Sequence, residues 1–460
     1  MSMTTFQRST RSASRFTPAE MQARMLHRRA VEAALWGMPL VNFDAMRQAY
    51  FRDAGAQYND ILYWSRPSDW KYQTATPNNS TNYIMFFVNL KDGPVVVDIP
   101  ATQEAALFGS LVDSWNFALS DVGNTGQDKG QGGRYLLIPP DHRAQPAPGY
   151  IGIQSTTYNV YSLLRVIPRT HGTLDMAKAL EYVKKIQVHP LWTTESSHHS
   201  ELIDMAGKRF EAIAPYDASF YASLARMVGE EPVKTRDITM MGELHSLGIG
   251  KTLTYRPDVR TLEIFERAIT EAHAYMVEGW RHAGFEWWPK RKWRFPVGED
   301  VIKSGGTFIA DERVLLDERA FSFFGAFAMS RYPQPNLYVM TFEDGSGELL
   351  DGTFTYRLRV PADVPTKQFW SVVAYDTETA AFIREAPVVG LDSYNPKLER
   401  NPDGSVDLYF APQPPRGHAA NWIATIPGRL FFAVFRNYTP EKSVLERTST
   451  WTLNDIERVA

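Results

Sequence analysis

The sequence contains no cysteine among its 460 residues. Disulfide bonds, thiolate metal sites, a cysteine nucleophile and a lipid anchor attached to cysteine are therefore excluded. No apolar segment of signal-peptide length precedes Met25, and no apolar run approaches the length of a membrane span. From these absences we expect a soluble, cytoplasmic protein with no membrane partner.

The chain also lacks a strong charge of either sign. Its 49 Lys and Arg residues stand against 52 Asp and Glu residues, which gives a formal net charge of −3. This balance offers no electrostatic case for binding nucleic acid or an anionic membrane, so we expect neither as a partner.

The common catalytic motifs are missing too. Gly250-Lys251-Thr252 looks like the end of a phosphate-binding loop, but the glycine required five residues earlier is His245. Neither Gly-x-Ser-x-Gly nor His-Glu-x-x-His occurs. The glycine-rich stretch 123–133 is followed by a predicted strand and not by the helix of a dinucleotide site. No cofactor can be assigned, and our leading hypothesis involves no metal.

Aromatic residues are abundant, with 12 Trp, 21 Tyr and 26 Phe. The length exceeds the size at which a single hydrophobic core stops growing, so two or more domains are expected. Thr17-Pro18-Ala19-Glu20 has the pattern of a capped helix start, and the helix is predicted to end near Trp36-Gly37. A second long helix is predicted where apolar residues repeat at intervals of three and four between Leu262 and Met276.

The remaining patterns define the expected fold class, α+β. Strands are predicted at residues 83–88, 94–100, 135–138, 160–167, 354–360, 369–375 and 430–435. We divide the chain into a flexible tail (1–16), a mixed α+β N-terminal domain (17–190), a mainly helical connecting region (191–334) and a C-terminal β-sandwich of jelly-roll-like type (335–460).

Two charged residues lie in runs that should be buried. Asp113 stands between Leu111-Val112 and Ser114-Trp115, and Arg165 lies inside a predicted strand. A buried carboxylate needs donors, or its pKa rises and it becomes a candidate acid or base. The two residues are either structural, paired with each other or with the backbone, or they line a polar cleft.

The turn and strand segments carry more polar residues of this kind. Asn78 and Asn79 follow Pro77 and most simply brace a turn, while Arg436 follows a predicted strand and either forms a structural ion pair or binds an anion. His198 and His199, with Glu201 nearby, are the densest set of potential metal ligands. Adjacent histidines point apart on a regular element, so only one would serve a given ion.

These segments resemble a known pair of domains. The Pro77-Asn78-Asn79-Ser80-Thr81 turn, the Asp113-Ser114-Trp115-Asn116 segment, the glycine-rich loop and Arg165 are similar to the domain of unknown function 1254. Leu350-Asp351-Gly352, Phe369-Trp370-Ser371, Asn401-Pro402-Asp403-Gly404-Ser405 and Asn421-Trp422 resemble its usual partner, the domain of unknown function 1214.

The resemblance implies an α+β N-terminal domain and a jelly-roll-like C-terminal domain, but no settled activity. Two departures from the family pattern matter. Many relatives look exported, whereas this chain lacks the signal. The Asn-Asp common after the proline turn is Asn79-Ser80 here, which removes a carboxylate from that position.

Our leading hypothesis is an enzyme that acts on a small organic molecule by hydrolysis or other acid–base chemistry in a cleft between the domains. Asp113 and Arg165 are the predicted catalytic residues, with Arg165 or Arg436 holding an anionic group. The predicted substrate-binding residues are Asn78, Asn79, Tyr83, Trp115, Asn116, Asn421, Trp422 and Arg436.

Two alternatives stay open. In the first, the protein is a non-catalytic module that binds carbohydrate or another small molecule. In the second, it is a metal-dependent enzyme that uses His198 or His199 with Glu201. The oligomeric state is not determined by the sequence, and a homo-oligomer is among the alternatives.

Overall fold

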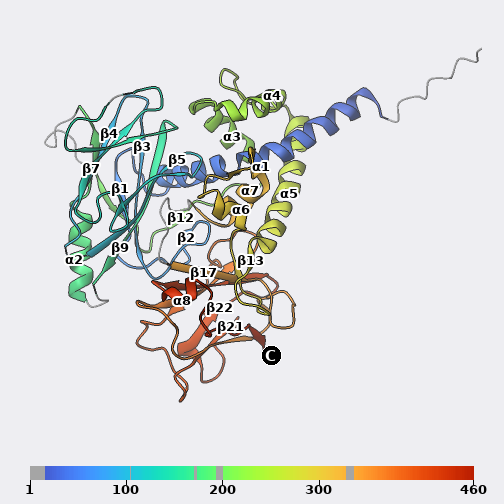
Figure 1. Ribbon diagram of the computed structural model, residues 1–460. Helices are drawn as coiled ribbons and strands as arrows, with labels where there is room; N and C mark the ends of the chain where they lie inside the picture. Colours follow the sequence, from blue (N-terminus) through green and yellow to red (C-terminus); the bar gives the residue numbers. More distant parts are fainter. Residues whose placement is uncertain are drawn as a thin grey trace, which may run out of the picture.

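The structure is a computed structural model that describes residues 16–103, 105–143, 145–169, 173–192, 200–327 and 336–459. Helices and several β-sheets follow one another along the chain, which confirms the predicted α+β class (Figure 1). The expected tail lies, except for Phe16, outside the described residues. No helix in these ranges is both long enough and apolar enough to cross a membrane.

Helix α1 (Pro18–Arg52) begins where the sequence predicts. Thr17 Oγ1 accepts the Glu20 N–H at 3.2 Å, and the Glu20 carboxylate accepts the Thr17 N–H at 2.7 Å. The predicted end near Trp36-Gly37 is wrong, because the helix continues to Arg52.

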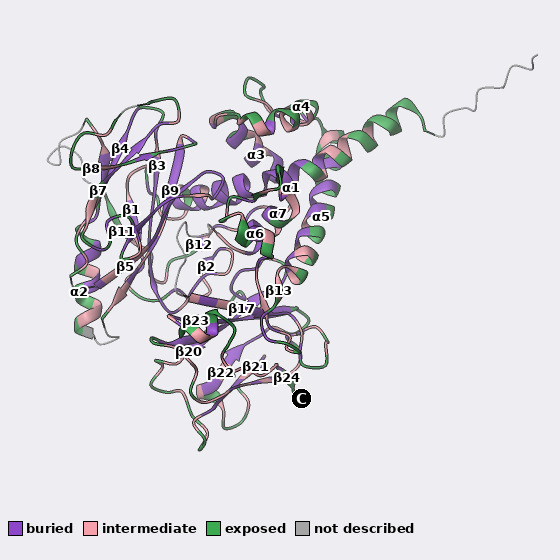
Figure 2. Ribbon diagram, in the orientation of Figure 1, coloured by how far each residue is buried: buried purple, intermediate pink, exposed green. Residues whose placement is uncertain are grey.

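The second half of α1 is buried on all sides, so its apolar residues form no single stripe that would reveal the continuation (Figure 2). Gly37 has a packing role: a Cβ atom at this position would lie 2.6 Å from Leu224 on helix α3 (Ser219–Glu230). Close helix contact, and not a helix end, accounts for this glycine.

The N-terminal domain is built around two sheets. A six-stranded sheet has the order β11 (Leu202–Asp204), β1 (Ile61–Tyr63), β3 (Asn82–Asn89), β9 (Asn159–Pro168), β5 (Ala105–Asp113), β6 (Ala118–Gly123). A four-stranded sheet has the order β10 (Gln187–Pro190), β4 (Val95–Ile99), β7 (Gly133–Ile138), β8 (Tyr150–Gln154). Apolar side chains of both sheets and of helix α2 (Thr173–Val183) share one core, which includes Phe86, Val97, Leu137 and Leu164.

The other face of the six-stranded sheet packs on α1. Alternate β3 residues point to opposite faces, so Phe86 enters the core between the sheets while Phe87 contacts Phe43 of α1, with ring centroids 5.4 Å apart. The small ladder of β2 (Tyr72–Gln73) with β12 (Phe210–Glu211) is separate from both sheets.

The connecting region is mainly helical. After α3 come η1 (Thr235–Asp237), α4 (Ile238–Ser246), α5 (Val259–His282), α6 (Glu299–Lys303) and α7 (Leu316–Gly325), with a short hairpin of β15 (Ile309–Ala310) and β16 (Arg313–Val314). The predicted long helix is confirmed as α5, which is capped by Asp258. Of the predicted apolar stripe it buries Phe265, Ile269, Ala272 and Met276, whereas Leu262 is exposed.

The C-terminal domain also contains two sheets. One has the order β13 (Phe285–Glu286), β14 (Arg294–Phe295), β17 (Asn336–Thr341), β23 (Phe431–Tyr438), β19 (Trp370–Asp376), β20 (Gly390–Asp392). The other has the order β22 (Trp422–Ala424), β21 (Val406–Ala411), β18 (Tyr356–Val360), β24 (Glu457–Arg458), and the short helices η2 (Ala419–Asn421) and α8 (Lys442–Leu445) complete the domain. The sequence predicted Arg436 just after a strand, and this is wrong, because β23 continues to Tyr438 and contains Arg436.

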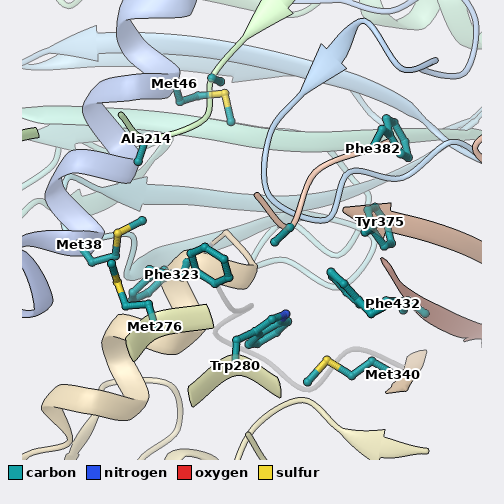
Figure 3. Packing of buried hydrophobic residues seen from close by; sticks show 14 of the residues in the cluster. Met38, Met46, Ala214, Met276, Trp280, Phe323, Met340, Tyr375, Phe382 and Phe432 are labelled. Carbon is teal, nitrogen blue, oxygen red and sulfur yellow. The ribbon is translucent and has the colours of Figure 1, made fainter. Parts of the chain in front are cut away.

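One hydrophobic core joins the two domains. Met38 of α1, Trp280 of α5 and Phe323 of α7 belong to the same buried cluster as Tyr375 and Phe432 of the C-terminal sheet (Figure 3). The helices therefore hold the two β-rich domains together over a continuous apolar contact.

Candidate functional site

Each domain contributes one arginine to a group of tyrosines that includes Tyr338 and Tyr438. Arg165 is on β9 and half-buried, and Arg436 is on β23 with 4% of its surface exposed. Within the described residues, neither guanidinium forms an ion pair with a carboxylate. A buried charge without a counterion is costly, so this pair calls for an explanation.

Tyrosines surround both guanidinium groups. The Cζ atom of Arg165 lies 5.3 Å from the ring centroid of Tyr83, and that of Arg436 lies 5.4 Å and 5.5 Å from the rings of Tyr375 and Tyr338. The ring of Tyr338 is 6.2 Å from that of Tyr438. We call this set the arginine–tyrosine cluster; its members are Arg165, Arg436, Tyr83, Tyr338, Tyr375 and Tyr438.

Strand register places these side chains. Tyr83 is directly opposite Arg165 in the β3–β9 ladder, and Tyr338 is opposite Arg436 in the β17–β23 ladder. Residues directly opposite each other in a ladder point to the same face of the sheet, which brings each arginine next to its tyrosine.

The C-terminal arginine contacts a turn of the N-terminal domain. Arg436 Nη2 donates to the Thr76 carbonyl at 3.1 Å and to the Tyr375 hydroxyl at 2.6 Å. That hydroxyl in turn donates to the Pro77 carbonyl at 2.5 Å. The proline turn expected from the sequence is thus bonded to the opposite domain.

Asn78 continues the same connection. Its backbone N–H donates to the Tyr83 hydroxyl at 2.8 Å, and its side-chain amide donates to the Tyr438 hydroxyl at 2.5 Å. The neighbouring Asn79 donates to the Gly390 carbonyl of β20 at 3.1 Å. Both asparagines therefore tie the two domains together beside the cluster.

The cluster keeps unused donors. Arg165 Nε and Arg436 Nη1 are buried and have no hydrogen-bond partner among the described residues. Burial raises the pKa values of the Tyr375 and Tyr438 hydroxyls, so both are protonated at neutral pH. Two positive charges with phenolic and guanidinium donors suit a carboxylate or a phosphate.

Asp113 does not meet Arg165. In the β5–β9 ladder Arg165 is opposite Phe108 and Asp113 is opposite Val160, five residue positions further along. At about 3.4 Å per residue the two backbones are roughly 17 Å apart, and an odd separation turns the side chains to opposite faces. The two predicted catalytic residues are therefore neither paired nor in one cleft.

The Asp113 carboxylate is occupied by local partners. It accepts the backbone N–H groups of Trp115 and Phe117, both at 3.0 Å, and a short hydrogen bond from the Thr156 hydroxyl. Lys234 Nζ lies 3.7 Å away. These contacts brace the tight turn between β5 and β6.

Trp115 and Asn116 belong to the same turn. Trp115 packs edge-on against Trp36 of α1, with centroids 5.0 Å apart. Asn116 has a left-handed backbone, with φ of 63°, and its amide donates to the Pro39 carbonyl at 2.6 Å. Among the described residues, neither Trp115 nor Asn116 forms a hydrogen bond or ring contact with a member of the arginine–tyrosine cluster.

In the C-terminal domain, Asn421 ends η2 and Trp422 begins β22, the edge strand of the four-stranded sheet. The Asn421 amide donates to the carbonyls of Glu399 and Asp407, at 2.8 Å and 2.9 Å, and the Trp422 indole donates to the Ala411 carbonyl at 2.8 Å. Their polar groups are thus used inside that domain.

The metal-ligand alternative falls mostly outside the described residues, which do not include His198 and His199. Within the described ranges, His, Asp and Glu nowhere gather in a group of three suited to a metal ion. The hypothesis stays a prediction.

Sequence reasoning missed three members of the cluster, Tyr338, Tyr375 and Tyr438. Each stands in a strand whose neighbours are largely apolar. A buried tyrosine hydroxyl needs a hydrogen-bond partner. A tyrosine inside an apolar strand was therefore the sequence signal that could have identified these three residues.

Solved structures resemble this chain at low sequence identity. No curated protein matches the chain. A crystal structure of the VPA0106 protein from Vibrio parahaemolyticus covers 95% of this chain and 100% of its own, with 16% identity and a TM-score of 0.54, so the fold is shared. An uncharacterized protein from Burkholderia cenocepacia covers 95% of each chain, with 12% identity and a TM-score of 0.41.

Family models match both parts of the chain. Residues 58–190 match the model described as protein of unknown function (DUF1254), and residues 335–442 match the one described as protein of unknown function (DUF1214). The order is the one expected from the sequence motifs. The chain is therefore a member of the proteins that pair an N-terminal DUF1254 domain with a C-terminal DUF1214 domain.

Proposed function

We propose that this protein binds a small organic anion at the arginine–tyrosine cluster between its domains. The observation that carries the proposal is the pair of guanidinium groups, Arg165 and Arg436, which have unused buried N–H donors and no carboxylate partner within the described residues. A bound carboxylate or phosphate supplies the missing negative charge and the missing acceptors.

Exposure indicates the direction of approach. Arg165 and Tyr338 are half-buried, whereas Tyr83, Tyr375, Tyr438 and Arg436 are buried. A ligand that enters beside Arg165 and Tyr338 places its anionic group against the guanidinium groups and leaves the rest of the molecule near the aromatic rings. Aromatic walls around a few polar groups are typical of small-molecule sites.

Titration calorimetry with benzoate, succinate and phenyl phosphate tests the proposal. Arg165→Met and Arg436→Met should each lower the affinity for a bound anion about 10- to 100-fold, because a hydrogen bond to a charged group contributes about 1.5–3 kcal/mol. Arg359→Met is the matched control, since Arg359 is an exposed residue of β18 that pairs with Asp403 at 2.8 Å. If all three variants bound the anion with the same affinity as the wild type, the arginine–tyrosine cluster would not be the binding site.

An enzymatic role, hydrolysis or another acid–base reaction, has one observation in its favour. Guanidinium N–H groups and protonated phenols are the donors that stabilise an oxyanion in a transition state. Turnover of an ester and amide panel should then fall in Arg436→Met. Asp113 braces a distant turn, so we expect undiminished turnover in Asp113→Asn, which would exclude this carboxylate from the mechanism. Equal losses of turnover in Asp113→Asn and Arg436→Met would instead support a catalytic role for Asp113.

Carbohydrate binding is the second candidate, favoured by a cleft of about 300 Å³ in the C-terminal domain. Thr366, Gln368, Tyr394 and Arg400 are among the residues that line it, and Tyr394 is 46% exposed. An exposed ring can stack on a sugar, and domains of jelly-roll type, the type predicted here from the sequence, often carry sugar sites. Glycan-array binding that disappears in Tyr394→Ala would support this candidate.

A further inference from the structure

Three cations surround the indole ring of Trp115. The Cζ atoms of Arg319 and Arg236 lie 5.2 Å and 5.5 Å from the ring centroid, and Lys234 Nζ lies 5.7 Å from it. These residues come from the β5–β6 turn, from η1 and the segment before it, and from α7. The fold thus brings positive charges from distant parts of the sequence to one buried ring.

Two of the cations have acidic neighbours. Lys234 Nζ is 3.7 Å from the Asp113 carboxylate, and Arg236 Nε is 3.4 Å from the Asp237 carboxylate. Asp237 also accepts the Trp36 indole N–H at 3.1 Å. These contacts account for two of the three positive charges.

Arg319 is the third cation, and no described carboxylate pairs with it. It is completely buried, at 0% exposure, and within the described residues it takes part in no ion pair. Nη2 donates to the Trp36 carbonyl at 2.9 Å. Burial and, to a smaller extent, the nearby Arg236 lower the pKa of Arg319 to about 9, although Asp237 opposes the shift. The side chain is still positively charged at neutral pH, so the group carries one charge in excess.

The three residues Trp115, Arg236 and Arg319 carry several unsatisfied donors, and the adjacent Asn116 of the same turn as Trp115 carries an unsatisfied acceptor, Oδ1. In the part of the chain that the structure describes, four buried donors have no hydrogen-bond partner: Arg319 Nε and Nη1, Arg236 Nη2 and Trp115 Nε1. Buried polar groups are almost always bonded, and an unpaired donor on a charged group is especially costly. Water would accept these hydrogen bonds but would leave the positive charge uncompensated. One monovalent anion would accept the hydrogen bonds and also neutralise the charge.

We propose that Trp115, Arg236 and Arg319, together the tryptophan–arginine cluster, bind one small monovalent anion of the halide class. Trp115 is 3% exposed and Arg319 is fully buried, so the site encloses its ligand and favours a small, dehydrated ion. The anion joins α7, the η1 segment and the β5–β6 turn. This site shares no residue with the arginine–tyrosine cluster and is independent of the proposed function.

The probe is bromide, which replaces chloride and can be located by anomalous scattering. Halide-free protein is unfolded thermally in increasing sodium bromide, with sodium gluconate keeping the ionic strength constant. At ten times its dissociation constant, bromide should lower the unfolding equilibrium constant about elevenfold. In crystals grown with bromide, an anomalous peak should lie within hydrogen-bond distance of Arg319 and of Trp115 Nε1.

Variants separate this site from general salt effects. Arg319→Met should abolish the response to bromide, and Arg359→Met, at the exposed arginine of β18, should retain it. If Arg319→Met does not fold, Trp115→Phe serves instead, because it keeps an aromatic ring, loses one donor and should weaken the response. Identical unfolding of the wild type in bromide and gluconate, without an anomalous peak, would overturn the proposal and assign the donors to water.

Discussion

Replacing Arg47 with methionine should destabilise the fold strongly. Arg47 lies on α1 with 2% of its side chain exposed, and its guanidinium pairs with Asp44 at 2.7 Å and with Glu230 at 2.6 Å. It also donates to Asn159 of β9 at 3.0 Å. One side chain therefore joins α1, α3 and the N-terminal sheet, and methionine keeps only its apolar stem.

The magnitude follows from what is left behind. Breaking a buried ion pair by removing one partner costs about 3–5 kcal/mol. Asp44 is fully buried but keeps Ser223 and Arg226 as donors, and Glu230 is 26% exposed and can be hydrated. We therefore expect the lower end of the range, about 3 kcal/mol, which is a large part of a typical domain stability of about 5–15 kcal/mol.

Urea unfolding followed by tryptophan fluorescence measures this loss. The control is Lys303→Met, because Lys303 pairs with Glu299 on the exposed surface of α6 and its removal should have no measurable effect. The double variant Arg47→Met/Glu230→Gln should lose less than the sum of the single variants, since the two residues interact directly. A loss below about 1 kcal/mol for Arg47→Met would refute the reasoning.

Two further predictions concern other contacts. Burial lowers the pKa of His273, whose Nε2–H donates to the Glu378 carbonyl at 2.7 Å, below its ordinary value near 6.5. As the pH falls, the His273 side chain of the unfolded protein is therefore protonated before that of the folded protein. The stabilising contribution of the neutral His273 is present above about pH 6.5 and is lost as the pH falls through the pKa of the folded state. His273→Gln keeps a donor but does not titrate, so its unfolding free energy, measured by urea titration from pH 7.5 to pH 5, should fall less than that of the wild type; parallel curves would contradict this. Gly284 has a φ of 73°, and a Cβ atom there would lie 1.7 Å from the Phe295 carbonyl oxygen. Gly284→Ala should therefore cost more than the roughly 1–2 kcal/mol of a left-handed residue, whereas Gly229→Ala, at an open helical position, should stabilise by about 0.5–1 kcal/mol. Thermal unfolding of both variants compares them, and equal midpoints would show that the contact at Phe295 relaxes without cost.

Local patterns predicted those features that depend on nearby residues. The capping box of Thr17 and Glu20 and the apolar face of α5 involve positions three or four apart, so the sequence displays them directly. The end of α1 was not predictable in this way. Its second half is covered by elements distant in sequence, and Gly37 is explained only by the approach of Leu224.

The candidate site divides along the same line. The motifs identified Asn78, Tyr83, Arg165 and Arg436 one by one, and the structure places them together, while Asp113 is about five residue positions from Arg165 along the shared ladder. Pairing register is set by the whole sheet and by its turns, so it cannot be read from either strand alone.

The sequence by itself determined the two domain types and their order, the α+β class, the beginning of α1 and the existence of α5, because each depends on local spacing or on short motifs. Only the tertiary structure decided which buried charges meet. Arg165 and Arg436 both lie near Tyr338 and Tyr438, and Arg319 lies beside Trp115, because contacts between distant segments arise only when the strands, turns and helices pack into one core.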